Sequence, residues 1–438
     1  MLRLRHQFLS GSKANNLELK MNEQILWIWL SLACTPGTES FRKLIDCFQT
    51  PESVYAADKD SITSVLGKKC ADITALSDKN TDRAREILDF CIRKNIGILN
   101  FSDANFPPML KSIKNPPVLL YYRGVLPDFK EVFCISVVGT RRLSEYGLRN
   151  AFSISRDLAV AGATVVSGMA VGVDGVAHAG ALSADGITIA VLGSGIDVCY
   201  PSDHKMLARE IVKRGCVFTE YAPGTKPEKN NFPRRNRIIS ALSHATLVIE
   251  GKERSGALIT ARCAYKQERK VYALPGNVGN SNSQLTNLLI KNGASLCSSA
   301  DDIVRDFEES SLGLLNPFKL AESKKADPFE FLRRYSVSAL TSSDRVFSRT
   351  KKKRAEAKAT KNTENAKNDN IKAPEPDTAL FDKETLQIYK KIPQGEECTI
   401  ESLVDSALPL RKVMKGLLKL EMGRFIVMLP GEKVKRNF

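Results

Sequence analysis

The chain has 438 residues, of which 43% are hydrophobic, so it is long enough for two or three domains with a sizeable core. Lysine and arginine outnumber aspartate and glutamate by 65 − 49 = 16, and an excess of this size favours a polyanionic partner. No apolar run reaches the roughly 18 residues that a membrane-spanning helix needs, so we predict no association with a membrane.

The ten cysteines are scattered along the chain and include no C-x-x-C pair. Several lie inside apolar stretches such as FCISVV (133–138) and GCVFTEY (215–221). This distribution is typical of free thiols in a reducing compartment, and we therefore predict a cytoplasmic protein without a disulfide framework or a zinc site.

The N-terminal part is predicted to be mostly helical. Residues 1–21 show no hydrophobic periodicity, which predicts a disordered extension in which Met21 is an alternative start to Met1. The apolar run ILWIWLSLAC (25–34) resembles the core of a signal peptide, but no cleavage site follows and the helical pattern continues to Ile45. We interpret the run as a core helix of a helical domain over residues 22–125.

Residues 126–308 alternate short β-rich runs with amphipathic helical stretches. The predicted strands are CISVVG (134–139), ATVVSG (163–168), TIAVLGSG (188–195), CVFTEY (216–221), ATLVIEG (245–251) and KVYALPG (270–276). A helical stretch follows each of them. Six strand–helix pairs in succession predict an α/β fold with a Rossmann-like, doubly wound parallel sheet.

The C-terminal third differs in composition. Residues 309–380 lack a periodic apolar pattern and are predicted to be a flexible linker, in which 349–373 carries nine basic and three acidic residues. Residues 381–438 show two helical stretches, a turn and a terminal hairpin. This pattern favours a winged helix-turn-helix, and a small helical cap is the alternative.

Ligands of doubly wound sheets bind at the carboxyl ends of the strands. Four loops there are rich in glycine or arginine, namely GTRR (139–142), SGMAVGVDG (167–175), LGSGIDVCYP (192–201) and FPRRNR (232–237). None of them completes the dinucleotide fingerprint G-x-G-x-x-G, and no segment reads G-x-x-x-x-G-K-[ST]. We therefore predict neither a bound dinucleotide nor a Walker-type nucleotide site.

The search for catalytic and metal-binding residues gives no candidate set. Asp174 and His178 stand four residues apart on one predicted helix, which is half of a metal site, but we interpret them as a helix cap and a histidine packed on the first turn. No third ligand is suggested, and Ser167, Ser194 and Ser255 are not in nucleophile elbows. The prediction is no catalytic residue, no metal and no cofactor.

A phosphate-binding edge is what these loops can form together. The predicted contacts from the residues alone are the basic side chains Arg141, Lys229, Arg234, Arg235, Arg237, Arg254 and Arg262, the expected helix start at Asn236, and the small residues Ser255 and Gly256. Phe232 beside the arginines suits stacking on a base of single-stranded nucleic acid. The alternative is that its ring folds back and staples the entry to the helix.

In order, SVVGTRR (136–142), SGMAVGVDGVAHAGAL (167–182), FPRRNRIISALS (232–243) and VIEGKERSGALITARCA (248–264) resemble the DNA-processing protein A (DprA, Smf) family. The resemblance implies a sterile-alpha-motif-like N-terminal domain and a C-terminal winged helix. It implies a cofactor-free homodimer that binds and protects single-stranded DNA in natural transformation and loads a RecA-type recombinase on it. The phosphate-binding residues carried over are Gly139, Thr140, Arg141, Ser167, Gly168 and the arginines of 232–237. Val171 departs from the basic residue usual in the second motif.

Two other classes of function stay open on the sequence. One is a phosphoribohydrolase of nucleoside monophosphates, but the stretch SGALITAR (255–262) lacks the glutamate that such enzymes need. The other is a regulator that senses a nucleotide and binds duplex DNA through the winged helix. Release of free base from AMP would indicate the first, and a preference for duplex DNA would indicate the second.

Overall fold

A computed structural model of the chain describes residues 11–323, 326–337, 382–394, 396–406, 408–422, 425–429 and 433–436. Two compact units are present, Met1–Lys353 and Arg354–Phe438. Among the described residues, no helix combines the length and the apolar character that crossing a bilayer requires. The basic stretch 349–373 and residues 1–10 lie outside the described residues.

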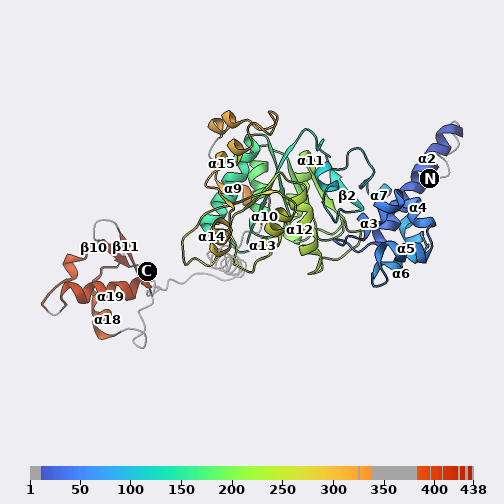
Figure 1. The fold of residues 1–438 in the computed structure, drawn as a ribbon. Coiled ribbons are helices and arrows are strands. Elements are labelled where there is room, and N and C mark those ends of the chain that lie inside the picture. The colour runs from blue at the N-terminus through green and yellow to red at the C-terminus, as the bar shows by residue number, and fades with distance from the viewer. Residues whose placement is uncertain are drawn as a thin grey trace, which may run out of the picture. The chain divides into compact units, whose positions relative to one another are not determined.

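Six helices open the first unit and gather beyond the β2 end of its sheet (Figure 1). They are α2 (Gly11–Ala33), α3 (Ser40–Phe48), α4 (Pro51–Ala56), α5 (Lys59–Leu66), α6 (Asp72–Ser77) and α7 (Asp82–Arg93). Trp27, Ile28 and Leu30 are buried, which confirms the prediction of a core helix over 25–34. The expectation of disorder is wrong for residues 11–21, because they form the first turns of α2.

One nine-stranded sheet organises the rest of this unit, in the order β1-β2-β6-β5-β4-β3-β7-β8-β9. The strands are β1 (Gly97–Asn100), β2 (Leu119–Gly124), β3 (Phe133–Val138), β4 (Ala163–Ser167), β5 (Thr188–Val191), β6 (Cys216–Thr219), β7 (Ala245–Val248), β8 (Lys270–Ala273) and β9 (Ser295–Leu296). The six predicted strands are β3 to β8, and all pairings among them are parallel. The predicted doubly wound sheet is therefore confirmed.

The sheet reaches further toward the N-terminus than the sequence suggested. Strand β2 pairs antiparallel with β6, and β1 pairs antiparallel with β2. The residues of both strands had been placed in the helical domain 22–125. Strands of four and six residues give only a brief apolar signal, and for this reason the sequence pattern did not reveal them.

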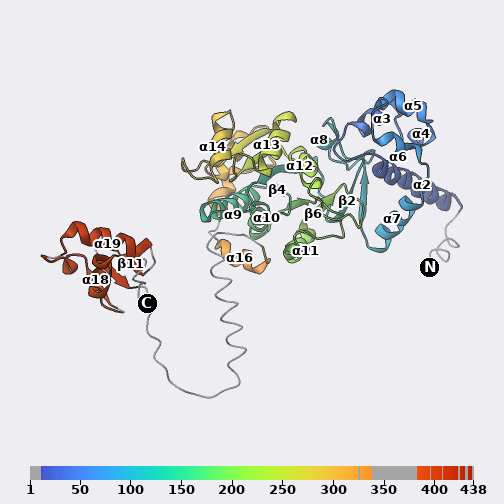
Figure 2. The same cartoon turned by 90° about the horizontal axis from the view of Figure 1, so that it is seen from below.

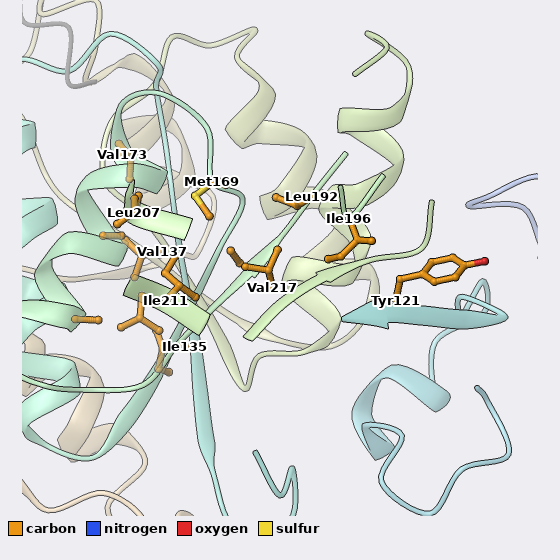
Figure 3. Packing of buried hydrophobic residues seen from close by; sticks show 14 of the residues in the cluster. Tyr121, Ile135, Val137, Met169, Val173, Leu192, Ile196, Leu207, Ile211 and Val217 are labelled. Carbon is orange, nitrogen blue, oxygen red and sulfur yellow. The ribbon is translucent and has the colours of Figure 1, made fainter. Parts of the chain in front are cut away.

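Helices cover both faces of the sheet (Figure 2). On one face lie α9 (Glu145–Val160), α10 (Val173–Ser183) and α11 (Lys205–Arg214), which the short η2 (Ser202–His204) precedes; on the other lie α8 (Pro108–Lys111), α12 (Asn231–Ala241), α13 (Gly256–Lys266) and α14 (Gln284–Lys291). Ile135 and Val137 of β3 belong to the same apolar cluster as Leu207 and Ile211 of α11 (Figure 3). Strands β3 to β7 are buried along their whole length, as is usual for the parallel part of a sheet that helices cover on both faces.

Helix α12 starts earlier than the sequence predicted. We expected a helix from Asn236, but α12 begins at Asn231, so the whole FPRRNR stretch is helical. The predicted start was too late because a proline, here Pro233, usually marks a helix boundary. In the first turn its missing N–H costs no hydrogen bond, so the helix accepts it.

The predicted linker 309–380 begins with ordered structure. After α15 (Ala300–Asp306), the chain forms η3 (Pro317–Glu322) and α16 (Pro328–Arg334). Leu315, Leu332 and Tyr335 are buried in the main core. Pro328, Leu332 and Tyr335 do follow helical spacing, but a helix of seven residues gives too short a periodic pattern to be recognised in the sequence.

The second unit is small and has its own apolar core. It contains α18 (Lys383–Lys391), β10 (Glu397–Thr399), η4 (Glu401–Leu403), α19 (Leu410–Met422), β11 (Ile426–Leu429) and β12 (Lys433–Arg436). The three strands form an antiparallel sheet in the order β10-β12-β11.

Candidate functional site

A pocket of about 690 Å³ lies where the strand order of the sheet reverses, between β3 and β7. This reversal is the place where doubly wound sheets bind their ligands. We call it the switch-point pocket. It is lined by Val138, Gly139, Thr140, Arg141, Ala170, Asp174, Tyr200, Pro227, Lys229, Phe232, Pro233, Arg235, Asn236, Ile239, Ser255, Gly256, Ala257, Ile259 and Thr260. Three of the four predicted loops and Tyr200 of the fourth therefore meet there.

The loop after β3 is held between the loops that follow its two neighbouring strands. The backbone N–H of Thr140 donates to the carbonyl of Glu250 at 2.8 Å, and the N–H of Val173 donates to the carbonyl of Thr140 at 3.1 Å. Gly172 has a φ of +90°, and a Cβ there would overlap the Thr140 carbonyl. The glycine is needed because the two loops approach each other at backbone distance.

Glu250 is a supporting residue that the sequence analysis did not identify. Its buried carboxylate accepts hydrogen bonds from the backbone N–H and the hydroxyl of Ser144, the N-cap of α9, the former at 2.9 Å. The Asn282 side chain donates to the same carboxylate at 3.3 Å. Glu250 therefore fixes the far end of the GTRR loop, and its only sequence signal was its position directly after an apolar strand.

The N-terminal turns of three helices line the pocket, since Asp174 and Gly256 lie in the first turns of α10 and α13, and Phe232 and Pro233 lie in the first turn of α12. No described side chain caps the first turn of any of these helices. The hydroxyl oxygen of Ser255, the N-cap position of α13, is buried and has no partner among the described residues. The first N–H groups of Val173, Gly175 and Asn231 donate to backbone carbonyls. The helix dipoles and the remaining N–H groups of the first turns make these termini favourable for anions.

The rim of the pocket combines cations with aromatic rings. Arg141 and Lys229 are exposed. The Arg141 guanidinium lies 5.4 Å from the ring centre of Phe232, and the Phe232 ring centre lies 5.6 Å from that of Tyr200. Tyr200 is 43% exposed and was not predicted as a site residue. The rim thus offers charges for phosphates and ring faces for bases.

Arg235 forms the floor of the pocket rather than its rim. Its guanidinium is buried and donates to the carbonyls of Gly168, at 2.6 Å, and Val191. Burial lowers the pKa of Arg235 to about 10, which the nearby Asp174 carboxylate opposes. Burial also raises the pKa of Asp174, against the effect of Arg235. Much of the hydrogen-bonding capacity of Arg235 is therefore used within the fold.

Arg237 does not reach the pocket. Its guanidinium donates to both carboxylate oxygens of Glu220, at 2.6 and 3.1 Å, and both side chains are 5% exposed. Arg234 is exposed and packs its stem beside Gly37, which precedes α3. The three arginines of one helical stretch therefore point to three different places.

The remaining predicted residues divide between the interior and the surface. Ser167 is fully buried and donates to the carbonyl of Val137 at 2.6 Å. Gly168 packs directly against the Arg235 guanidinium, where a Cβ would not fit. Arg254, which precedes α13, and Arg262 on α13 are exposed outside the lining of the pocket.

The histidine considered as a metal ligand is engaged within the core. The Nδ1 atom of His178 lies 2.7 Å from the hydroxyl of Thr188, and burial lowers the pKa of His178 to about 3. Asp174 accepts a long hydrogen bond of 3.4 Å from the N–H of Ala170, and the N-cap of α10 is Gly172 rather than Asp174. Among the described residues, no three His, Cys, Asp or Glu side chains are grouped to hold a metal ion.

Comparison with known proteins identifies the family. Residues 97–308 match the family model described as DNA recombination-mediator protein A. Over 429 residues the chain is 31% identical to protein Smf of Synechocystis sp., an alignment that covers 95% of this chain and 99% of that protein. The chain belongs to the DprA (Smf) family.

Other members of the DprA family agree with this assignment. The DNA processing protein DprA of Bacillus subtilis is 37% identical over 225 residues, which cover 51% of this chain and 76% of that protein. The crystal structure of DprA from Streptococcus pneumoniae matches with a TM-score of 0.54 and 33% identity, covering 61% of this chain and 92% of that one. Proteins of the DprA family are DNA-binding recombination mediators and not enzymes, so the phosphoribohydrolase alternative is dropped.

Proposed function

We propose that the chain binds single-stranded DNA in the switch-point pocket. The observation that carries the proposal is the meeting of three helix N-termini that no described side chain caps with an aromatic pair, Phe232 and Tyr200, at one pocket. The N-termini, Arg141 and Lys229 suit phosphates, and the rings suit unstacked bases. Paired bases of a duplex present no free face to the rings, so a single strand fits this pocket better.

Each predicted site residue has a proposed role. Arg141, Lys229, Asn236, Ser255 and Gly256 contact the strand, and Phe232 stacks on a base. Gly139 and Thr140 shape the loop that carries Arg141, and Arg235 with Gly168 and Ser167 supports the pocket from below. Arg237 stabilises the fold through Glu220, and Arg234 and Arg262 act only through long-range attraction of the strand.

Membership of the DprA family supports the biological setting of the proposal. Bound single strands are protected from nucleases and transferred to a RecA-type recombinase during natural transformation, with two copies of the chain acting as a homodimer in the cytoplasm. The order of α18, β10, η4, α19 and the β11–β12 hairpin supports a winged helix, and helices α2–α7 are proposed to be the sterile-alpha-motif-like domain. The basic stretch 349–373 is proposed to act as a tether, so its deletion leaves the preference for single strands intact.

Competition between two DNA forms tests the proposal. The full chain is bound to a labelled single strand, which is then displaced with unlabelled single strand or duplex of the same sequence. The strand has about 20 nucleotides, a length above the site sizes usual for single-strand-binding domains. The proposal expects the single strand to compete at least tenfold better than the duplex. Equal competition would contradict it and would favour a duplex-binding regulator.

A further inference from the structure

A second groove, of about 830 Å³, lies on the far side of α12 and α13 from the N-termini that open on the switch-point pocket. We call it the α13 groove. It is lined by Glu39, Ser112, Ile113, Lys114, Asn115, Arg237, Cys263, Lys266, Gln267, Glu268 and Arg269. Its walls come from the start of α3, the segment after α8 and the C-terminal end of α13, and the switch-point pocket uses none of these residues.

Helix α13 connects the switch-point pocket with the α13 groove. Ile259 lines the switch-point pocket, and Cys263 and Lys266 line the α13 groove. These positions recur every three or four residues, so they lie along one side of α13. Lys266 follows Ile259 by seven positions along the helix, which is a rise of about 10 Å at 1.5 Å per residue. Arg262, between them in sequence, is exposed.

The α13 groove carries cations that the fold leaves available. Lys114 and Lys266 are exposed, and neither forms an ion pair with a described carboxylate; the same holds for Arg262 beside them. Arg269 is half-buried, and its Nε has no hydrogen-bond partner among the described residues. Lys114, Lys266 and Arg269 are therefore the cations of the groove lining that form no ion pair within the described part of the chain.

Two carboxylates limit the positive potential of the groove. Glu39 and Glu268 are exposed at its wall, against Lys114, Lys266 and Arg269, while the charge of Arg237 is already neutralised by Glu220. Among the residues that line the groove, three available cations therefore stand against two anions. This surface attracts a flexible polyanion that touches it at a few phosphates, and it offers no aromatic platform for bases.

We infer that the α13 groove holds the phosphates of the same single strand after the strand leaves the switch-point pocket along α13. The inference rests on the proposed function, and it adds a second segment to the binding site. The pocket engages bases and phosphates of a short stretch, and the groove engages only the backbone of the nucleotides that follow. A longer strand therefore gains affinity from Lys114, Lys266 and Arg269 that a short strand does not.

Strand length separates the two segments experimentally. The binding of fluorescein-labelled single strands of about 6 and about 20 nucleotides, which bracket common site sizes, is measured by anisotropy with the full chain. In Lys114→Ala/Lys266→Ala the affinity for the long strand is expected to fall about tenfold, and its salt slope by about 1.4, that is about 0.7 for each lost phosphate contact. The affinity for the short strand stays the same.

Matched variants complete the test. Glu39→Gln/Glu268→Gln is expected to strengthen binding of the long strand alone, because it removes two repulsive charges from the groove. Lys68→Ala/Lys69→Ala, which removes two exposed lysines outside both hollows, is expected to alter the long strand by less than about twofold, because distant exposed charges are screened. Thermal melts show that each variant is folded.

Either of two results would overturn the inference. If Lys114→Ala/Lys266→Ala binds both strands like the unaltered chain, or loses the same factor on both, the groove does not hold the strand. In that case the unaltered chain still binds the short strand and the proposed function stands. If the unaltered chain binds neither strand, the proposed function fails together with the inference.

Discussion

Arg237 and Glu220 form a buried, two-pronged ion pair, with Nη–Oε distances of 2.6 and 3.1 Å. Glu220 follows β6 and Arg237 lies on α12, so the pair ties the helix that opens on the switch-point pocket to the sheet beneath it. A guanidinium with this partner is held away from the pocket. The sequence pattern alone had placed Arg237 among the phosphate contacts.

Removal of Arg237 is expected to destabilise the fold rather than to weaken binding directly. Arg237→Ala leaves the Glu220 carboxylate buried without its partner, which typically costs about 3–5 kcal/mol of unfolding free energy. Urea denaturation measures this loss. Arg237→Met/Glu220→Leu removes both charges and should recover most of the stability. A stable Arg237→Ala chain that has lost its affinity for single strands would return Arg237 to the binding site.

Removal of Arg141 is expected to weaken the binding of single strands without destabilising the fold. Its side chain is exposed on the rim, so Arg141→Ala should leave the melting temperature unchanged. The affinity for single strands should fall, and the salt slope should decrease by about 0.7 if one phosphate contact is lost. Arg142→Ala is the matched control, because Arg142 is also exposed but does not line the pocket. Equal effects of the two variants would contradict a specific role for Arg141.

Substitutions of Phe232 distinguish a ring that stacks on a base from a ring that only packs on the sheet. Its ring is half-buried and contacts the Gly193 backbone, where a Cβ would lie 2.9 Å from the ring edge. If the free face stacks on a base, Phe232→Ala should weaken single-strand binding by about 1–3 kcal/mol, or about 5- to 150-fold. Phe232→Leu keeps the packing and should lose nearly as much affinity. A Phe232→Leu chain with normal affinity would leave the ring only a packing role.

His178 is expected to make the fold sensitive to acid. Because burial lowers its pKa to about 3, the folded chain stays unprotonated there while the unfolded chain takes up a proton below about pH 6.5. Stability from this group is therefore complete above pH 6.5 and falls with pH, by about 1.4 kcal/mol per unit, until about pH 3. Urea denaturation at pH 7 and pH 5 should show a smaller difference in His178→Asn than in the unaltered chain. An unchanged difference would contradict the assignment.

The parallel strands and their helices could be predicted from the sequence because strands buried on both faces are continuous apolar runs. Strands β3 to β8 were found for this reason, and the loops at their carboxyl ends followed from the topology. The positions and partners of the arginine side chains could not be predicted. Arg235 donates to the carbonyl of Gly168, 67 residues away, and Arg237 to the carboxylate of Glu220, 17 residues away. The residues next to an arginine in the sequence carry no information about such long-range contacts. Tyr200 was missed because it lies in a loop that was noted for its glycines.

Photo-crosslinking tests the central claim most directly, since it locates the strand on the chain. A single strand that carries 5-iodouracil at successive positions is bound to the full chain, irradiated and mapped by mass spectrometry of the crosslinked peptides. The account predicts crosslinks to Tyr200 and Phe232, lost when the switch-point pocket is altered by Arg141→Ala/Lys229→Ala. Crosslinks confined to residues 349–438, with none at the pocket, would contradict it.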